Sequence, residues 1–188
     1  MGEKLSTGEI NPGTLKIPGT VRSMGIGAFN KCAYLGTVIF AEGDTAVLEI
    51  DAGDSYNAMF DSCPELTTVI LPERITKLKS YTFYNDPKLQ TLYIPAGVAE
   101  IASNTIFNCP KLTIYGVSNS AAETYTKQNK IPFKSKDDIN IGLEVQSVTL
   151  TPSFIEKIGE DSIGKKIQLS TEVLPDTAQF TQVSKFAL

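Results

Sequence analysis

Few residues in this 188-residue chain have side chains suited to catalysis or metal binding. It contains three cysteines and no histidine, so it lacks the commonest general base and the commonest metal ligand in proteins. It also contains no Gly-x-Ser-x-Gly segment and no phosphate-binding glycine loop, the patterns that position a nucleophile or a nucleotide. The sequence therefore predicts no catalytic residues, no cofactor and no enzyme activity.

Acidic side chains are the remaining candidates for metal ligands. No basic residue lies between Lys31 and Arg74, and that stretch holds eight acidic residues: Glu42, Asp44, Glu49, Asp51, Asp54, Asp61, Glu65 and Glu73. Carboxylates such as Asp51 and Asp54 can bind calcium together with backbone carbonyls. Their spacing matches no calcium-loop motif, and acidic side chains in loops are by default solvated, so we predict no metal site.

A repeated pattern runs from about Thr14 to Tyr115, and its best copies begin at Leu66 and at Leu89. The first contains Leu66, Val69, Leu71, Pro72, Ile75, Leu78 and Phe83, and its counterpart contains Leu89, Leu92, Ile94, Pro95, Val98, Ile101 and Ile106. Two earlier copies run from Leu15 to Cys32 and from Val38 to Cys63. A period of about 20–29 residues with this leucine spacing predicts a leucine-rich-repeat solenoid, which is a parallel β ladder with short irregular or 3₁₀ returns.

The three cysteines share one position in the repeat, which indicates a small apolar side chain inside each coil. A disulfide is the alternative, since Cys32 and Cys63 lie on adjacent coils about 4.8 Å apart, within reach of an S–S bond. That pairing would leave Cys109 without a disulfide partner. We therefore expect buried free thiols.

The order Leu-x-x-Leu-x-Ile-Pro, then Val-x-x-Ile, then Phe-x-x-Cys-x-x-Leu resembles the BspA-type (Treponema-type) leucine-rich repeats of bacterial surface proteins over about residues 10–136. There are departures from the pattern. Asp86 replaces the cysteine of the third copy, and Ile106 replaces the aromatic residue of the fourth. The second copy is longer, because the step from Phe29 to Phe60 exceeds the step from Phe60 to Phe83 by eight residues. We expect a bulging loop or extra hairpin at residues 41–57, with Val47 to Ile50 as a short strand.

Residues 112–133 are similar to the C-terminal cap of such arrays. Ser120 and Glu123 form a capping-box pattern that predicts a cap helix over residues 121–128. Ala122 and Tyr125 would face inward, and Ile131 to Phe133 would pack as a last extended segment. The predicted organisation is a polar lead-in (1–13), the solenoid with its cap (14–136), a linker (137–144) and a β segment (145–188).

The strands of the ladder would point alternate residues outward in two columns. One column is Thr14, Thr37, Thr68 and Thr91, and the other is Lys16, Ile39, Ile70 and Tyr93. Threonine favours strands because it is β-branched, so its column needs no function. The second column is an exposed apolar strip, which often marks a contact surface, although the insertion or another chain could cover it. The candidate ligand-binding residues are Lys16, Thr37, Ile39, Thr68, Ile70, Thr91 and Tyr93.

The C-terminal segment alternates with period two around Val148 and Leu150, and again around Ile167 and Leu169. It resembles the first half of a bacterial Ig-like (group 2) domain, a partial all-β segment too short for a whole sandwich. Half a sandwich leaves its apolar face open. A second copy of the chain, the solenoid itself or a crystal neighbour must cover that face, and we favour a homodimer through this segment.

Composition limits the partners. The net charge of −4 without a polybasic block argues against nucleic acid. No apolar run approaches the length that would suggest membrane insertion, roughly 18 residues or more. The first residues do not form a signal peptide, so an export signal would lie outside this sequence. The resemblance implies a cell-surface or secreted adhesion module that binds a host or bacterial surface protein or a glycan. The alternatives are a structural stalk or spacer, and a non-catalytic segment of a larger surface enzyme.

Overall fold

The computed structural model describes residues 2–5, 7–43, 46–51, 53 and 57–139. The described residues belong to one compact unit, residues 1–139. The expected Ig-like segment and the homodimer through it lie outside the described residues.

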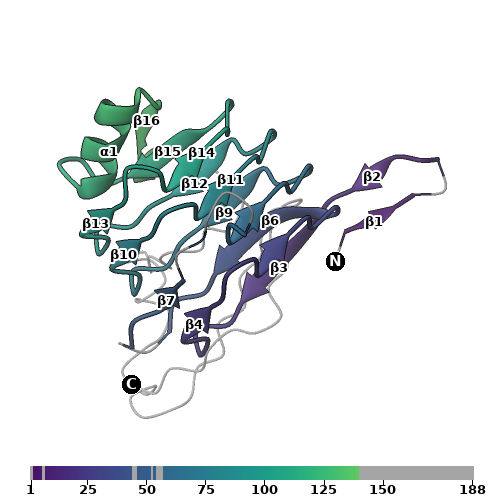
Figure 1. The fold of residues 1–188 in the computed structure, drawn as a ribbon, viewed down its shortest axis with the longest axis horizontal. Helices are drawn as coiled ribbons and strands as arrows, with labels where there is room; N and C mark the ends of the chain where they lie inside the picture. Colours follow the sequence, from purple (N-terminus) through teal and green to yellow (C-terminus); the bar gives the residue numbers. More distant parts are fainter. Residues whose placement is uncertain (1, 6, 44–45, 52, 54–56, 140–188) are drawn as a thin grey trace, which may run out of the picture. The chain divides into compact units, whose positions relative to one another are not determined.

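A parallel six-stranded sheet forms one side of this unit (Figure 1). Its strands lie side by side in chain order: β3 (Gly13–Ile17), β6 (Leu35–Phe40), β9 (Thr68–Ile70), β12 (Thr91–Tyr93), β15 (Thr113–Gly116) and β16 (Phe133–Ser135). The first four are the strands predicted from the repeats, and β6 pairs with β9 across the insertion. The predicted parallel ladder is confirmed, and the segment after the cap helix adds the sixth strand.

The returns between these strands are short secondary strands. Four of them form a second parallel sheet: β5 (Phe29–Asn30), β8 (Phe60–Asp61), β11 (Phe83–Tyr84) and β14 (Ile106–Phe107). Two further parallel pairs lie between these sheets along the chain, β4 (Ser23–Met24) with β7 (Glu49–Ile50) and β10 (Lys77–Leu78) with β13 (Glu100–Ile101). Each coil therefore makes backbone hydrogen bonds to the next at up to three places.

Phenylalanine rings stack in the core along the second sheet. The ring centroids of Phe29 and Phe60 are 4.8 Å apart, and those of Phe60 and Phe83 are 5.1 Å apart. Ile106 pairs with Phe83 at the next position of the same column. The predicted stacking of the three rings is confirmed, because parallel pairing repeats the same residue position at the strand spacing.

The eight extra residues of the second coil lie on both sides of β7, whose position at Glu49–Ile50 confirms the short strand predicted for Val47 to Ile50. The segment from Phe40 to Ile50 is three residues longer than its counterpart in the next coil, and the segment from Ile50 to Phe60 is five residues longer. Between these insertions β7 pairs in parallel with β4, and Leu48 and Ile50 are buried. The alternation of Val47 to Ile50 thus supplies the return strand of the coil itself, because burying Leu48 and Ile50 favours that register.

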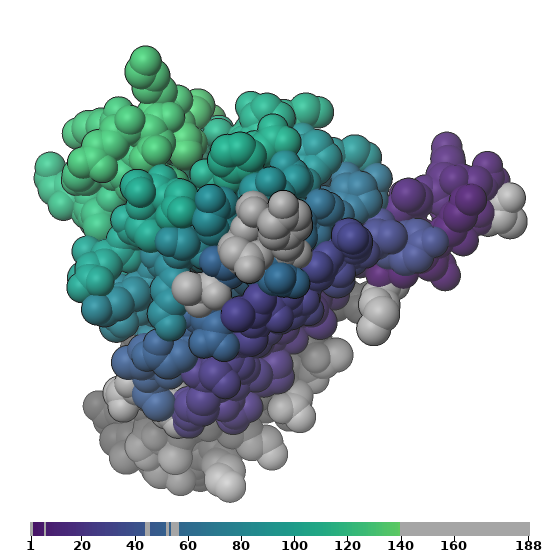
Figure 2. All heavy atoms as spheres, in the orientation of Figure 1, coloured from purple at the N-terminus to yellow at the C-terminus, as the bar shows by residue number. Residues whose placement is uncertain are grey.

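The N-terminal lead-in is a hairpin. Strands β1 (Glu3–Lys4) and β2 (Ile10–Asn11) pair antiparallel, and Gly8 supplies the positive φ of +87° that the turn needs. The hairpin projects away from the coils (Figures 1 and 2). The composition of residues 1–13 had predicted a polar lead-in but not its strand pairing.

The helix α1 (Ala121–Asn129) closes the C-terminal end of the solenoid, with Ala122 and Tyr125 buried as predicted. The side chain of Ser120 caps it by accepting a hydrogen bond from the backbone N–H of Glu123 (3.4 Å). The Glu123 carboxylate reaches back to the N–H of Asn119 (2.6 Å), one residue before its place in a standard capping box. A 3₁₀ turn, η1 (Lys136–Asp138), follows β16.

We predict that Ser120→Ala lowers the free energy of unfolding by about 1 kcal/mol, because the N–H of Glu123 loses its acceptor. Urea unfolding followed by circular dichroism measures the change. Ser118→Ala is the matched control, since Ser118 is exposed and lies outside the helix. Equal losses in both variants would contradict the assigned cap.

Candidate functional site

The register of the main sheet aligns the predicted outward residues in two columns. Lys16, Ile39, Ile70 and Tyr93 are paired in sequence across β3, β6, β9 and β12, and Thr14, Thr37, Thr68 and Thr91 are paired in the same way. Lys16 is exposed, but Ile39, Ile70 and Tyr93 are half-buried. The apolar strip is thus only partly exposed, since strands about 4.8 Å apart cover the flanks of each other's side chains.

Both columns extend beyond the residues that were predicted. Thr113 follows Thr91, and Tyr115 follows Tyr93. Lys134 of β16 then pairs with Tyr115 and places its ammonium group 6.0 Å from the centre of that ring. The motif Thr-x-Tyr at 91–93 and 113–115 could have revealed the first extension. The repeat period does not predict that Lys134 joins this column, because the cap helix interrupts the repeat. We call the second column, Lys16, Ile39, Ile70, Tyr93, Tyr115 and Lys134, the ladder strip.

The ladder strip is apolar and aromatic in its middle and positively charged at both ends. Acidic side chains border it at the turns after β6 and β9, where Glu42 and Glu73 lie. The hydroxyl of Tyr93 donates to Oε1 of Glu73 (2.9 Å), and the backbone N–H of Glu73 donates to the carboxylate of Glu42 (3.0 Å). Burial, and next the bond to Glu73, raises the pKa of Tyr93. Tyr93 is therefore fixed in position and uncharged at neutral pH.

The cysteine column lies inside the solenoid and holds free thiols, of which Cys63 is buried and Cys32 and Cys109 are partly buried. Burial raises the pKa of Cys63 to about 12, so the thiol stays protonated and is a poor nucleophile or metal ligand at neutral pH. Asp86 occupies the same position in the third coil with no exposed surface. One of its oxygens accepts from the N–H of Cys63 (2.9 Å), and the other has no partner among the described residues.

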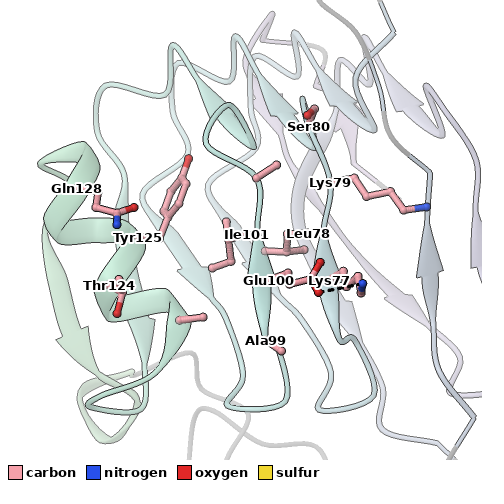
Figure 3. Close-up of a pocket in the computed structure, with 12 residues that line it drawn as sticks. Lys77, Leu78, Lys79, Ser80, Ala99, Glu100, Ile101, Thr124, Tyr125 and Gln128 are labelled. Atoms are coloured by element: carbon pink, nitrogen blue, oxygen red, sulfur yellow. Dashed lines mark ion pairs between the residues drawn. The ribbon is translucent and has the colours of Figure 1, made fainter.

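A cavity of about 800 Å³ lies between the return strands β10 and β13 and the helix α1 (Figure 3). Lys77 and Glu100, which line it, form an exposed ion pair of 3.0 Å. The hydroxyl of Tyr125 on its other side is engaged by the backbone N–H of Ile106 (3.3 Å). Lys77 and Glu100 are paired with each other, and Tyr125 is bonded to the backbone. The lining therefore offers a groove for a ligand rather than a nucleophile with an adjacent base.

Within the described part of the chain, no group of three or more cysteine and carboxylate side chains is arranged to hold a metal ion. Asp54, one of the two residues considered for calcium, lies outside that part. Among the described residues, no helix has the length and apolar character needed to cross a membrane.

The geometry defines a parallel-β repeat solenoid closed by one helix, a class of protein that presents extended faces rather than a deep pocket. Residues 8–130 match the BspA type leucine rich repeat region in six copies, where the spacing alone had indicated four. The chain belongs to this family. Membership indicates a binding or structural role for the repeats.

A leucine rich cell surface protein from Faecalibacterium prausnitzii A2-165 is similar in structure, with 27% sequence identity and a TM-score of 0.46. The match covers 61% of this chain and 31% of that one, so this chain spans less than a third of that protein. No curated protein matches the chain.

Proposed function

We propose that this chain is a non-catalytic binding module of a cell-surface or secreted protein, and that it engages a surface protein or a glycan through the ladder strip. The observation that carries the proposal is the register of the main sheet, which places Ile39, Ile70, Tyr93 and Tyr115 next to one another on its outward face. Membership of the BspA-type family supports a location at the cell surface.

The chemistry of the ladder strip favours a partner with a flat apolar centre. Isoleucine and tyrosine supply contact area with few rotatable bonds, which lowers the entropy lost on binding. Lys16 is exposed at one end, and Lys134 is exposed at the other. Two positive ends would favour acidic groups on the partner at the matching spacing, through electrostatic complementarity.

A structural spacer is the second candidate function, and the half-burial of Ile39, Ile70 and Tyr93 favours it. Side chains that cover one another can stabilise the sheet through cross-strand contacts without any ligand. The two functions differ in what a change on the ladder strip would do. A spacer would lose only stability, whereas a binding module would lose its partner.

We predict that Tyr93→Ala weakens binding about tenfold, because a central aromatic side chain is the commonest kind of interface hot spot. A screen against extracellular matrix proteins and a glycan array identifies the partner, and titration calorimetry measures the affinity of each variant. Tyr93→Phe keeps the ring and loses only the bond to Glu73, so it should weaken binding by less than about threefold. Binding that survives Tyr93→Ala unchanged, with the fold intact by circular dichroism, would contradict the ladder strip as the binding surface.

A further inference from the structure

An aromatic pair lies on the outward side of the second sheet, apart from the ladder strip. The rings of Tyr84 and Phe107 stack with centroids 5.2 Å apart and planes 13° apart. Tyr84 is half-buried, but Phe107 is 51% exposed. The reason is the strand order, since β14 is the edge of its sheet and no described strand follows it. One face of the Phe107 ring therefore contacts Tyr84, and the other faces the open edge.

A backbone N–H and a side-chain amide oxygen at this edge also have no hydrogen-bond partner among the described residues. In the earlier coils the residue after the return strand donates its N–H to the next coil, with Lys31 bonding Asp61 (2.7 Å) and Asn85 bonding Phe107 (3.0 Å). Asn108 occupies this position in the last coil, and its N–H has no acceptor among the described residues. That N–H points the same way as the open face of Phe107, because both continue the direction of the stack.

The side chain of Asn108 is held in place beside this donor. Its Nδ2 donates to Oδ1 of Asn85 (2.7 Å), which leaves its own Oδ1 as an acceptor without a partner among the described residues. Lys31, Ser62, Asn85 and Asn108 all have φ between 52° and 56°, a region that asparagine tolerates better than most residues. The edge thus combines an open aromatic face, a fixed donor and a fixed acceptor.

We propose that this edge is a saccharide subsite, in which a neutral pyranoside stacks on Phe107 and hydrogen-bonds to Asn108. A β-glucoside carries its hydroxyls equatorially, so both faces of its ring present C–H groups with the positive polarity that suits the negative face of an aromatic ring. Its hydroxyls both donate and accept, and so match the N–H and Oδ1 of Asn108. Tyr84, Asn85, Phe107 and Asn108 include no carboxylate, ammonium or guanidinium group, which favours a neutral sugar.

A peptide strand fits this edge less well. Strand addition to β14 would use the N–H groups of both Ile106 and Asn108. The hydroxyl of Tyr125 already accepts from Ile106 at 3.3 Å, so only one of the two donors is open. A ligand that needs a single backbone donor is favoured.

Titration of the ¹⁵N-labelled chain with methyl β-D-glucopyranoside tests this subsite by NMR. The amide signal of Asn108 should shift saturably with a Kd of roughly 1 mM or weaker, as expected for a ligand of this size. Phe107→Leu keeps an apolar side chain but removes the ring, and should weaken binding roughly tenfold. Phe107→Trp should retain it. Tyr93→Leu is the control on the ladder strip and should leave this Kd unchanged, so the test is independent of the proposed partner of that strip.

Three results would overturn the saccharide subsite. The first is no saturable shift of Asn108. The second is an equal shift in Phe107→Leu or with glycerol, which would show that no ring stacking is involved. The third is a shift with an extended peptide of alternating threonine and valine but none with the glycoside, which would make this edge a strand-pairing site.

Discussion

Replacing Phe83 with alanine is expected to lower the free energy of unfolding by about 3–5 kcal/mol. The ring has no exposed surface and stacks in parallel on Phe60, with the planes 1° apart. Its removal leaves a cavity between two coils that are held in register by backbone hydrogen bonds, so the structure can relax only partly. Urea unfolding at a single pH measures the loss.

Phe107→Ala is the matched control, because it removes the same side chain from an exposed position outside the core column. It should cost less than about 1 kcal/mol. A loss in Phe83→Ala no larger than the loss in Phe107→Ala would contradict the stacked core, and with it the register of the four-stranded second sheet.

Asp86 should make the protein less stable as pH rises from about 4 to about 7. Burial raises the pKa of this carboxyl from 3.8 to about 7 in the folded state. Between those values the folded protein holds a proton that the unfolded chain has released, so the free energy of unfolding falls by about 1.4 kcal/mol per pH unit. The stability contributed by protonated Asp86 is fully present below about pH 4 and is lost above about pH 7.

Asp86→Asn removes this titration and keeps an oxygen to accept from the N–H of Cys63. The free energy of unfolding of the variant minus that of the parent protein should therefore be roughly 2–4 kcal/mol larger at pH 8 than at pH 5. Chemical unfolding at the two pH values measures the difference, and Asp138→Asn at an exposed position is the control. A stability difference between Asp86→Asn and the parent that does not change with pH would show that Asp86 is not the group responsible.

The main sheet and the phenylalanine column could be predicted because equivalent positions in successive coils have the same packing environment. Each strand needs alternate apolar residues, and each return needs a large apolar side chain at one position, so a regular repeat period fixes both. Val38, Val69 and Leu92 are accordingly buried at equivalent places. The helix could be predicted from Ser120 and Glu123, because capping depends on residues close in sequence.

The course of the second coil could not be predicted from its length alone. A single insertion of eight residues and two shorter insertions give the coil the same length. Only the burial of Leu48 and Ile50 distinguishes the two arrangements. The hairpin of residues 3–11 was missed for a related reason. Its pairing depends on the turn at Gly8, within a segment that has no apolar alternation to mark its strands.

The candidate binding surface was only partly predictable. Strand alternation identified which residues face outward, and so gave Ile39, Ile70 and Tyr93. How far each is exposed depends on its neighbours in adjacent strands, which the sequence does not specify. Lys134 joins the ladder strip only because the chain returns to the sheet after α1, and the open face of Phe107 depends on β14 being an edge.

The most direct test of the ladder strip as a recognition surface compares two substitutions of isoleucine by lysine. Ile70 lies in the middle of the ladder strip, whereas Ile26 is 56% exposed and lies outside the main sheet. With the partner from the binding screen, calorimetry should find that Ile70→Lys weakens binding by about 100-fold or more, since it buries an unpaired charge in the interface. Ile26→Lys should leave the affinity unchanged. Equal affinities for both variants and the parent protein, with the fold intact, would contradict recognition through the ladder strip.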